Sequence, residues 1–261
     1  MLQTCHVIRN RVQHCSSTLI KRLTTQQIKK EVINLPRDFR GHTAFALYNV
    51  LTQEECNKYI KVSEDIGYEA AKVGKNQIVL TDIRQSSRCL WDTSEETNKI
   101  WNIIKPYIPA TWQNRKVIGL NESIERTCFP TMRCWWKNFT KPGFTAKDKN
   151  IRLTFDGFGY CFRLRFLRYD PGEYFKPHYD GRYERETGEK SYFTIQVYLN
   201  EGYKGGSTNF LSRNRKEKVE FIQKLGSILV FQHDMLHEGS ELISGRKYTI
   251  RTDIMYSSIT I

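Results

Sequence analysis

The sequence lacks several features that would place it in a familiar class of protein. No apolar run approaches the roughly 18 residues that a membrane-spanning helix needs, so we expect no transmembrane span. The seven cysteines are odd in number and form no CxxC pair, and no secretory leader is recognisable. We therefore expect reduced thiols in an intracellular compartment instead of a disulfide framework in a secreted protein.

Acidic residues are missing from the first thirty positions, which hold six basic side chains. This segment, part of a basic N-terminal extension over 1–35, is also rich in Ser, Thr and Gln, as mitochondrial presequences are. A disordered basic tail or an extra helix fits equally, so the expected location is mitochondrial or cytoplasmic. Without this segment, 35 basic residues (41 − 6) stand against 28 acidic ones. The body is only mildly cationic, and we do not expect nucleic acid as a partner.

What the sequence does contain, from about residue 162 onward, is a series of short stretches in which apolar and polar residues alternate. Glycine-rich turns separate them, and no helical period is present. This pattern predicts a mainly β fold with supporting helices, built as a barrel or jelly roll. With 261 residues and 39% apolar content, the chain can bury the core of one enzyme domain with extensions. The predicted strands cover 162–169, 192–200, 226–231 and 248–256.

Two helices are predicted upstream, in a support region that spans 36–122. Thr52 and Thr93 each stand three residues before a glutamate, which is the spacing of a helix-opening capping box. A strand over 44–51 precedes the first helix, and Pro106 helps to end the second. We expect these helices to brace the outer face of the β core.

His178 and Asp180 stand two residues apart, and His237 follows on a later predicted strand. Side chains two apart on a strand share one face, so this pair can hold a metal ion from one side while His237 completes the set. Two imidazoles and one carboxylate suit non-haem Fe(II) with open positions, whereas structural zinc prefers four closed ligands. A lone His-x-Asp also occurs by chance in surface strands and turns. His233 is the rival for the second imidazole, although we expect it to be a loop histidine.

These motifs and their order resemble the catalytic core of the Fe(II)/2-oxoglutarate-dependent dioxygenases, in particular the prolyl 4-hydroxylase-like branch. The resemblance covers roughly 163–256 and implies a double-stranded β-helix, a jelly-roll or cupin-like barrel. It also implies Fe(II), 2-oxoglutarate as cosubstrate, O2, and ascorbate as an assistant. The matching segments lie at 169–172, 178–180, 198–200, 205–210, 237–239 and 245–248.

The resemblance implies that one basic side chain holds the far carboxylate of 2-oxoglutarate, and Lys247 falls at the matching position. A buried cation of this kind selects a dicarboxylate, because only the bound ligand compensates its charge. Arg251 lies four residues on, on the same strand face, and is the second candidate: it would hold either the cosubstrate or an acidic part of the substrate. The alternative for both Lys247 and Arg251 is that they lie at a solvent-exposed, basic edge of the sheet and bind no ligand.

Two tyrosines, Tyr169 and Tyr198, match family tyrosines whose hydroxyls reach the cosubstrate, although both could equally be core aromatic residues. Thr194 and Gln196 share a strand face with Tyr198 by alternation. If Tyr198 lines the pocket, we expect these two side chains to line it as well.

The reaction implied by the resemblance is hydroxylation of a C–H bond with release of succinate and CO2. Halogenating relatives carry a small residue in place of Asp180, so its presence favours hydroxylation. A protein or peptide side chain such as prolyl is the expected substrate, and a small molecule is a further option. A nucleic-acid demethylase of the same superfamily and a non-catalytic binding barrel are the alternatives. The oligomeric state is not predicted.

One segment departs from the family pattern. Relatives run directly from a Gly-Leu-Asn-Glu strand into an Arg-Leu-Arg-Phe strand, whereas here 119–122 and 163–166 are separated by residues 123–162. This insert is either a lid over the site or a tolerated surface loop. The oxygenase core is then expected to span 163–261.

Overall fold

The structure is a computed structural model that describes residues 27–72, 78–120, 122–123 and 161–258. Residues 1–26 and 124–160 lie outside the described residues, so the presequence and the lid or loop remain predictions. Within the described ranges, no helix has the length and apolar content needed to cross a membrane.

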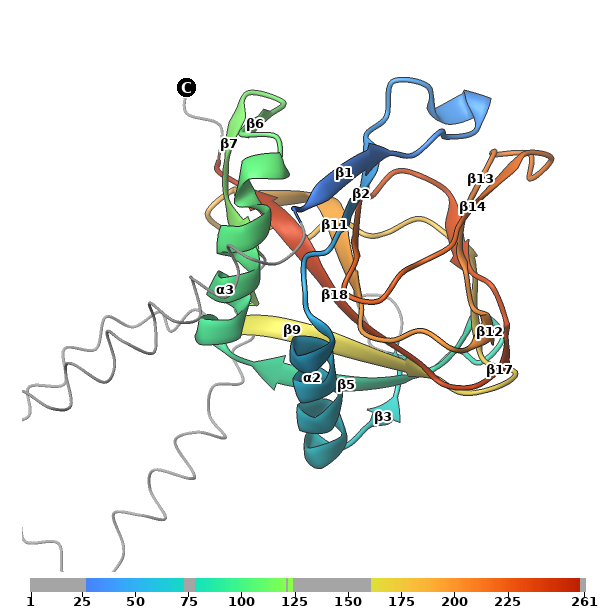
Figure 1. Ribbon diagram of the computed structural model, residues 1–261. Coiled ribbons are helices and arrows are strands. Elements are labelled where there is room, and N and C mark those ends of the chain that lie inside the picture. The colour runs from blue at the N-terminus through green and yellow to red at the C-terminus, as the bar shows by residue number, and fades with distance from the viewer. Residues whose placement is uncertain (1–26, 73–77, 121, 124–160, 259–261) are drawn as a thin grey trace, which may run out of the picture.

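A large antiparallel sheet forms one wall of the barrel (Figure 1). Its main path contains β1 (Lys29–Val32), β2 (Ala44–Tyr48), β15 (Ile228–Gln232), β11 (Lys190–Tyr198), β18 (Lys247–Tyr256), β9 (Cys161–Tyr169), β5 (Ser87–Asp92) and β3 (Glu69–Ala70), in that order. Three short strands join it off this path: β7 (Arg115–Leu120), β6 (Thr111–Trp112) and β8 (Glu122–Ser123).

A smaller antiparallel sheet forms the facing wall. Its strands, in order, are β14 (Lys218–Phe221), β13 (Thr208–Leu211), β16 (His237–Gly239), β10 (Tyr174–His178) and β4 (Arg84–Gln85). A separate two-stranded ladder joins β12 (Lys204–Gly205) to β17 (Leu242–Ser244). Two facing antiparallel sheets built from distant strands confirm the jelly-roll prediction.

Two α-helices, α2 (Gln53–Ile66) and α3 (Ser94–Ile104), lie on the outer side of the large sheet, beside β5 and β9 (Figure 1). Two short 3-10 helices, η1 (Arg37–Phe39) and η2 (Lys105–Tyr107), complete the described elements. The capping box at Thr52 is confirmed, because its side chain and that of Glu55 each bond the other's backbone N–H. Thr93 also caps its helix, because its side chain accepts from the Glu96 backbone N–H. The Glu96 carboxylate does not complete a capping box; it accepts a hydrogen bond from Tyr59 Oη over 2.7 Å.

The two faces of the large sheet differ in character. Its outer face carries apolar side chains such as Phe166, Ile195 and Ile250, which pack in one core with residues of α2 and α3. Its inner face carries polar residues, because alternation turns every second side chain toward the small sheet. Gln196, Arg251 and Arg165 are direct neighbours across three strands of this face. The fold therefore directs charged groups into the space between the sheets.

The N-terminal boundary differs from the predicted one. Residues 29–32, assigned to the extension over 1–35, form β1 and pair with β2 from Lys29↔Tyr48 to Val32↔Phe45. These four residues thus belong to the large sheet.

The insert over 123–162 lies mostly outside the described residues and stays a prediction, but the strands that flank it show where they could be joined. Leu120 pairs with Ile254 of β18, and Arg165 pairs with Arg251 of the same strand. If the pairing of β9 with β18 is continued beyond Arg165, residue 162 falls opposite Ile254. Leu120 of β7 already pairs with Ile254, so residue 162 and Leu120 correspond to the same position along β18. On this extended register, 42 residues (162 − 120 = 42), positions 121–162, separate the two segments that would form one strand along β18. Glu122 and Ser123 pair back onto β9 as β8 and leave the edge of β18.

Candidate metal and cosubstrate site

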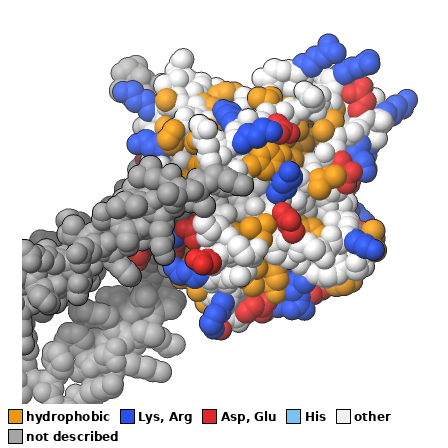
Figure 2. Space-filling view, in the orientation of Figure 1, with side chains coloured by type: hydrophobic (Ala, Val, Ile, Leu, Met, Phe, Trp, Pro, Cys, Tyr) orange, Lys and Arg blue, Asp and Glu red, His pale blue; other side chains and the backbone are white. Residues whose placement is uncertain are grey.

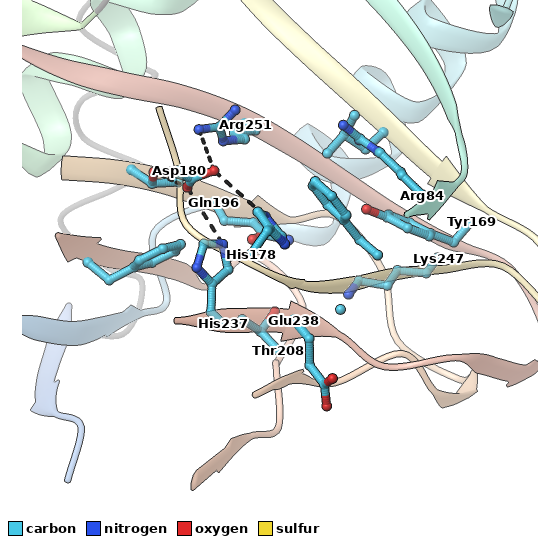
Figure 3. A pocket seen from close by; sticks show the side chains of 15 residues that line it. Arg84, Tyr169, His178, Asp180, Gln196, Thr208, His237, Glu238, Lys247 and Arg251 are labelled. Carbon is cyan, nitrogen blue, oxygen red and sulfur yellow. Dashed lines mark hydrogen bonds and ion pairs between the residues drawn. The ribbon is translucent and has the colours of Figure 1, made fainter. Parts of the chain in front are cut away.

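Three side chains that could hold a metal ion meet between the two sheets. His178 ends β10, His237 begins β16, and the two face each other across the ladder. Asp180 lies between them, with Oδ1 3.8 Å from His178 Nε2 and Oδ2 3.6 Å from His237 Nε2. The three ligand atoms lie within 4.8 Å of one another, and Figure 3 shows the side chains converging. The predicted set is thus brought together.

The orientation of both imidazoles is fixed by the backbone. His178 Nδ1 lies 2.7 Å from the Lys176 carbonyl oxygen, and His237 Nδ1 lies 2.9 Å from that of Met235. Each Nδ1–H is therefore donated to a carbonyl, which leaves the Nε2 lone pair directed at Asp180. Burial lowers the pKa of both histidines. Neutral imidazole with a free Nε2 is the form that binds a metal.

Asp180 lies beyond the strand, since β10 ends at His178. Strand alternation is therefore the wrong reason for the His-Asp pairing, and the Asp180 backbone is held by its N–H donating to the His233 carbonyl over 3.1 Å. Thr194 Oγ1 donates to Asp180 Oδ2 over 2.5 Å, and Arg251 Nη2 lies 2.8 Å from Oδ1. Burial alone would raise the pKa of Asp180, but Arg251 and the imidazoles outweigh it and hold the pKa well below its usual range. The carboxylate is ionised.

His233, the rival ligand, lies behind the site. It is 1% exposed, and its ring bonds to Thr194 Oγ1 and Ser191 Oγ, each over 3.0 Å. It lies in the turn that follows β15, as expected of a loop histidine, but it is buried there. Through Thr194 it supports the carboxylate of Asp180, and its own nitrogens are already engaged.

Lys247 lies at the other end of the same pocket (Figure 3). It is 2% exposed, and its Nζ donates to the Gly206 carbonyl and lies 5.4 Å from the Tyr169 ring centre and 5.5 Å from that of Tyr198. No ion pair links it to a carboxylate among the described residues. Burial lowers its pKa to about 7. This buried cation could accept an acidic ligand that the protein itself does not supply.

Gly206 allows this approach to Lys247. Its φ is +68°, a conformation that favours glycine, and a Cβ here would lie 3.0 Å from Leu242 Cδ1 and 3.4 Å from Lys247 Cδ. Its carbonyl oxygen also accepts from Gln223 Nε2 over 2.9 Å, which fixes the peptide that Lys247 contacts.

The other predicted site residues divide into two groups. Tyr169, Thr194 and Gln196 line the pocket together with Arg251. Tyr198 lies behind the pocket wall, fully buried, with its hydroxyl 2.8 Å from Thr208 Oγ1. Thr208 lines the pocket in its place. Direct contact between Tyr198 and the cosubstrate thus stays a prediction.

Sequence reasoning missed Arg84 and Phe175, which also line the pocket. Arg84 belongs to β4 of the small sheet, and the chain crosses to β5 of the large sheet within two residues, so Arg84 lies at the seam between the walls. Its neighbours Gln85, Ser86 and Ser87 are all polar and show no strand alternation. No local signal could have placed this arginine in the site.

Comparison with known proteins agrees with this geometry. Residues 164–252 match the family model of the 2OG-Fe(II) oxygenase superfamily, where 2OG is 2-oxoglutarate. A search of curated proteins found no match. The viral collagen prolyl hydroxylase of Paramecium Bursaria Chlorella virus-1, solved as a 2OG complex, is similar with a TM-score of 0.50 and 18% identity, over 83% of this chain and 98% of that one.

A prolyl hydroxylase from Trichoplax adhaerens, solved with a hypoxia inducible factor oxygen degradation domain peptide fragment, is similar with a TM-score of 0.53 and 11% identity. The match covers 83% of this chain and 85% of that one. At these low sequence identities, the two structures show only that the fold is shared. The assignment to the superfamily comes from the family model. The chain therefore contains a domain of the 2OG-Fe(II) oxygenase superfamily, built on the fold of prolyl hydroxylases, and is an oxidoreductase of the 2-oxoglutarate-dependent dioxygenase class.

Proposed function

We propose that this protein hydroxylates a C–H bond in a peptide or protein side chain, such as a prolyl residue, and releases succinate and CO2. One observation carries the proposal: the His178, Asp180 and His237 set lies at one end of a pocket, and Lys247, buried and without an ion pair among the described residues, lies at the other. The family match, which implies Fe(II), 2-oxoglutarate and O2, supports it.

The donor set fits Fe(II). Two neutral imidazoles and one ionised carboxylate leave room for further ligands on the pocket side, whereas a structural zinc site would be closed by a fourth protein ligand. Bound Fe(II) would supply the redox chemistry that couples O2 to the decarboxylation of 2-oxoglutarate. The carbonyl oxygens of Lys176 and Met235 would keep both histidines in the ligating tautomer.

Lys247 would hold the far carboxylate of 2-oxoglutarate. The ligand would replace the lost hydration of the ammonium group with a charge-assisted hydrogen bond, which is strong in a dry pocket. Tyr169 and Thr208 line the pocket and bring hydroxyl groups to the same part of it. Together these groups would set the orientation of the cosubstrate relative to the histidines.

The surface beside the pocket supports a peptide substrate. Just before Arg84, the side chains of Ile78, Val79, Leu80 and Ile83 are 40–50% exposed. The Ile83 carbonyl accepts from the Lys176 N–H, and the Thr81 carbonyl accepts from Tyr174 Oη, so this segment is attached to the strand that leads to His178. Exposed apolar residues at a pocket rim are typical of a binding surface. The peptide bound to the Trichoplax structure gives further support.

A nucleic-acid substrate is less well supported. On the face shown in Figure 2, lysine and arginine side chains alternate with acidic and apolar ones and form no continuous basic surface. Ascorbate remains part of the proposal, as a reductant that sustains turnover.

Succinate release tests the proposal. The full chain is incubated with Fe(II), ascorbate and 2-oxoglutarate, with and without panels of peptides, free amino acids and nucleosides. We expect iron-dependent succinate release that peptides stimulate, and its loss in His178→Ala but not in the control His42→Ala, a histidine outside the pocket. An iron-loaded protein that releases no succinate under any condition would contradict the proposal.

A further inference from the structure

The pocket contains a buried arginine, Arg84, that has no role assigned above, although it interacts with the hydroxyl group of Tyr169 (Figure 3). Arg84 is 6% exposed, and its Nε donates to Ser86 Oγ over 2.8 Å. Its Nη2 is buried and has no hydrogen-bond partner among the described residues. An unsatisfied guanidinium nitrogen costs free energy unless a ligand bonds to it. Arg84 lines the pocket, so a bound ligand could reach it.

The surroundings of Arg84 fix it in place without neutralising it. Its guanidinium carbon lies 4.6 Å from the ring centre of Phe175, its cross-strand neighbour in β10. Phe175 stacks in turn on His178, with ring centres 3.5 Å apart. Arg84 is thus held on the face of an aromatic ring next to a metal-binding imidazole, a position suited to contact a substrate near the reacting carbon.

Two more arginines lie close by on the large sheet. Arg251 lines the pocket and pairs across the ladder with Arg165, so both side chains point toward the space that Arg84 enters. The Nε atoms of Arg165 and Arg251 also lack partners among the described residues. Burial, together with the positive charges of Arg251 and Arg84, lowers the pKa of Arg165 to about 10, although Asp253 opposes this shift. The three cations therefore repel one another.

Two carboxylates balance this charge only in part: Asp180 raises the pKa of Arg84 and Asp253 raises that of Arg165, but burial and the neighbouring arginines lower both. Asp180 pairs with Arg251 but belongs to the metal set, and Asp253 lies 3.4 Å from the same Arg251 nitrogen. Neither carboxylate forms an ion pair with Arg84 or Arg165 among the described residues. The cosubstrate has its own cation in Lys247, at the other end of the pocket from Asp180 (Figure 3). An acidic ligand other than the cosubstrate would compensate the charge that remains on Arg84 and Arg165 and would give Arg84 Nη2 a hydrogen-bond partner.

We propose that the prime substrate carries a carboxylate, and that Arg84 binds it directly while Arg165 strengthens the local positive field. This inference rests on the proposed hydroxylase function. A carboxylate is the planar acceptor that matches the guanidinium fork. It could be an acidic side chain next to the hydroxylated residue of a peptide, or the free carboxylate of a small amino acid.

Matched acid and amide probes test the proposal. The full chain, loaded with Mn(II) and 2-oxoglutarate so that no turnover occurs, is titrated calorimetrically with two pairs. One pair is a proline peptide with aspartate or asparagine beside the proline, and the other is free L-proline or L-prolinamide. We expect the acid of one pair to bind at least about tenfold more tightly than its amide, and the pair that discriminates identifies the source. Equal affinities in both pairs, or no binding of either acid, would overturn the proposal.

Variants assign the preference to Arg84. In Arg84→Met the acid-to-amide ratio should fall close to one, whereas Arg84→Lys should keep part of it, which excludes a simple folding defect. The control Arg40→Met, at an exposed arginine, should keep the full ratio. An unchanged acid-to-amide affinity ratio in Arg84→Met would overturn the assignment to Arg84. The assignment would also fail if Arg84→Met required more 2-oxoglutarate while its acid-to-amide ratio stayed unchanged. If the wild-type protein releases succinate but shows no preference for the acid, only this inference is refuted. If the wild-type protein releases no succinate, the proposed function is refuted as well.

Discussion

Arg251 Nη2 lies 2.8 Å from Asp180 Oδ1, whereas Lys247, four residues earlier on the same strand face, forms no ion pair among the described residues. The two candidate anchors for 2-oxoglutarate therefore differ in environment. Arg251 is already engaged with a metal-binding carboxylate, and Lys247 is buried without a counter-charge. This difference favours Lys247 as the anchor and gives Arg251 a role in holding Asp180.

Lys247→Ala should weaken 2-oxoglutarate binding by roughly 10- to 100-fold, because it removes a charge-assisted hydrogen bond in a dry pocket. Binding of Mn(II) should change little, because Lys247 makes no contact with the metal set. Both affinities are measurable by calorimetry. If Arg251→Ala shows this pattern and Lys247→Ala does not, the anchor is Arg251.

The affinity for 2-oxoglutarate should depend on pH through Lys247. Its pKa of about 7 means that the unliganded protein carries the cation below pH 7 and loses it above. Binding needs the charged form, so affinity should level off below pH 7 and fall, approaching tenfold per unit, as pH rises above it. Above pH 7, binding should also take up a proton. The matched control is Lys247→Arg, in which the guanidinium stays charged and the pH dependence should flatten.

Metal binding should stabilise the folded chain. At a Mn(II) concentration about 100 times its Kd, linkage predicts about 2.7 kcal/mol, which corresponds to a rise in Tm of roughly 5–10 °C for a domain of this size. Differential scanning fluorimetry with and without Mn(II) measures this shift. His237→Ala should abolish it, and His42→Ala should preserve it. A full shift in His237→Ala would show that the metal binds elsewhere.

The sequence allowed the metal set to be predicted because its three residues lie in or next to strands with recognisable motifs. The physical reason was only partly right, since Asp180 lies past the end of β10 and is held by Thr194 and Arg251. Those contacts depend on the pairing of β11 with β18, which local pattern does not reveal. Arg84 could not be predicted at all, because only the crossing of the chain between two sheets brings it to the pocket.

The support of Asp180 by Thr194 can be tested separately. Thr194→Val keeps the shape of the side chain but removes the hydroxyl that donates to Asp180 Oδ2 and contacts His233. We expect Mn(II) affinity to fall roughly tenfold, at the lower end of the effect of losing an outer-shell partner. Thr194→Ser should retain the affinity, because it retains the hydroxyl. Equal losses in both variants would point to packing, not to the hydrogen bond.

The last prediction concerns the insertion in the edge of the large sheet. Deleting residues 121–162 joins Leu120 to Arg163 and keeps both registers on β18, so the barrel should fold without the insert. All proposed metal and cosubstrate residues lie outside the deletion. The shortened protein should therefore keep its Mn(II)-dependent rise in Tm and its 2-oxoglutarate turnover without substrate.

A one-residue variant provides the control for this deletion. Removing 121–161 leaves one extra residue in the joined strand, and a slip of one residue turns each side chain to the opposite face. The strand would have to absorb this residue as a bulge, so this protein should melt at a lower temperature than the 121–162 deletion. Equal Tm values would show that β7 and β9 are not one interrupted strand. If the 121–162 deletion is insoluble or binds no metal, the insert is part of the core. If it loses only the stimulation of turnover by substrate, the insert acts as a lid.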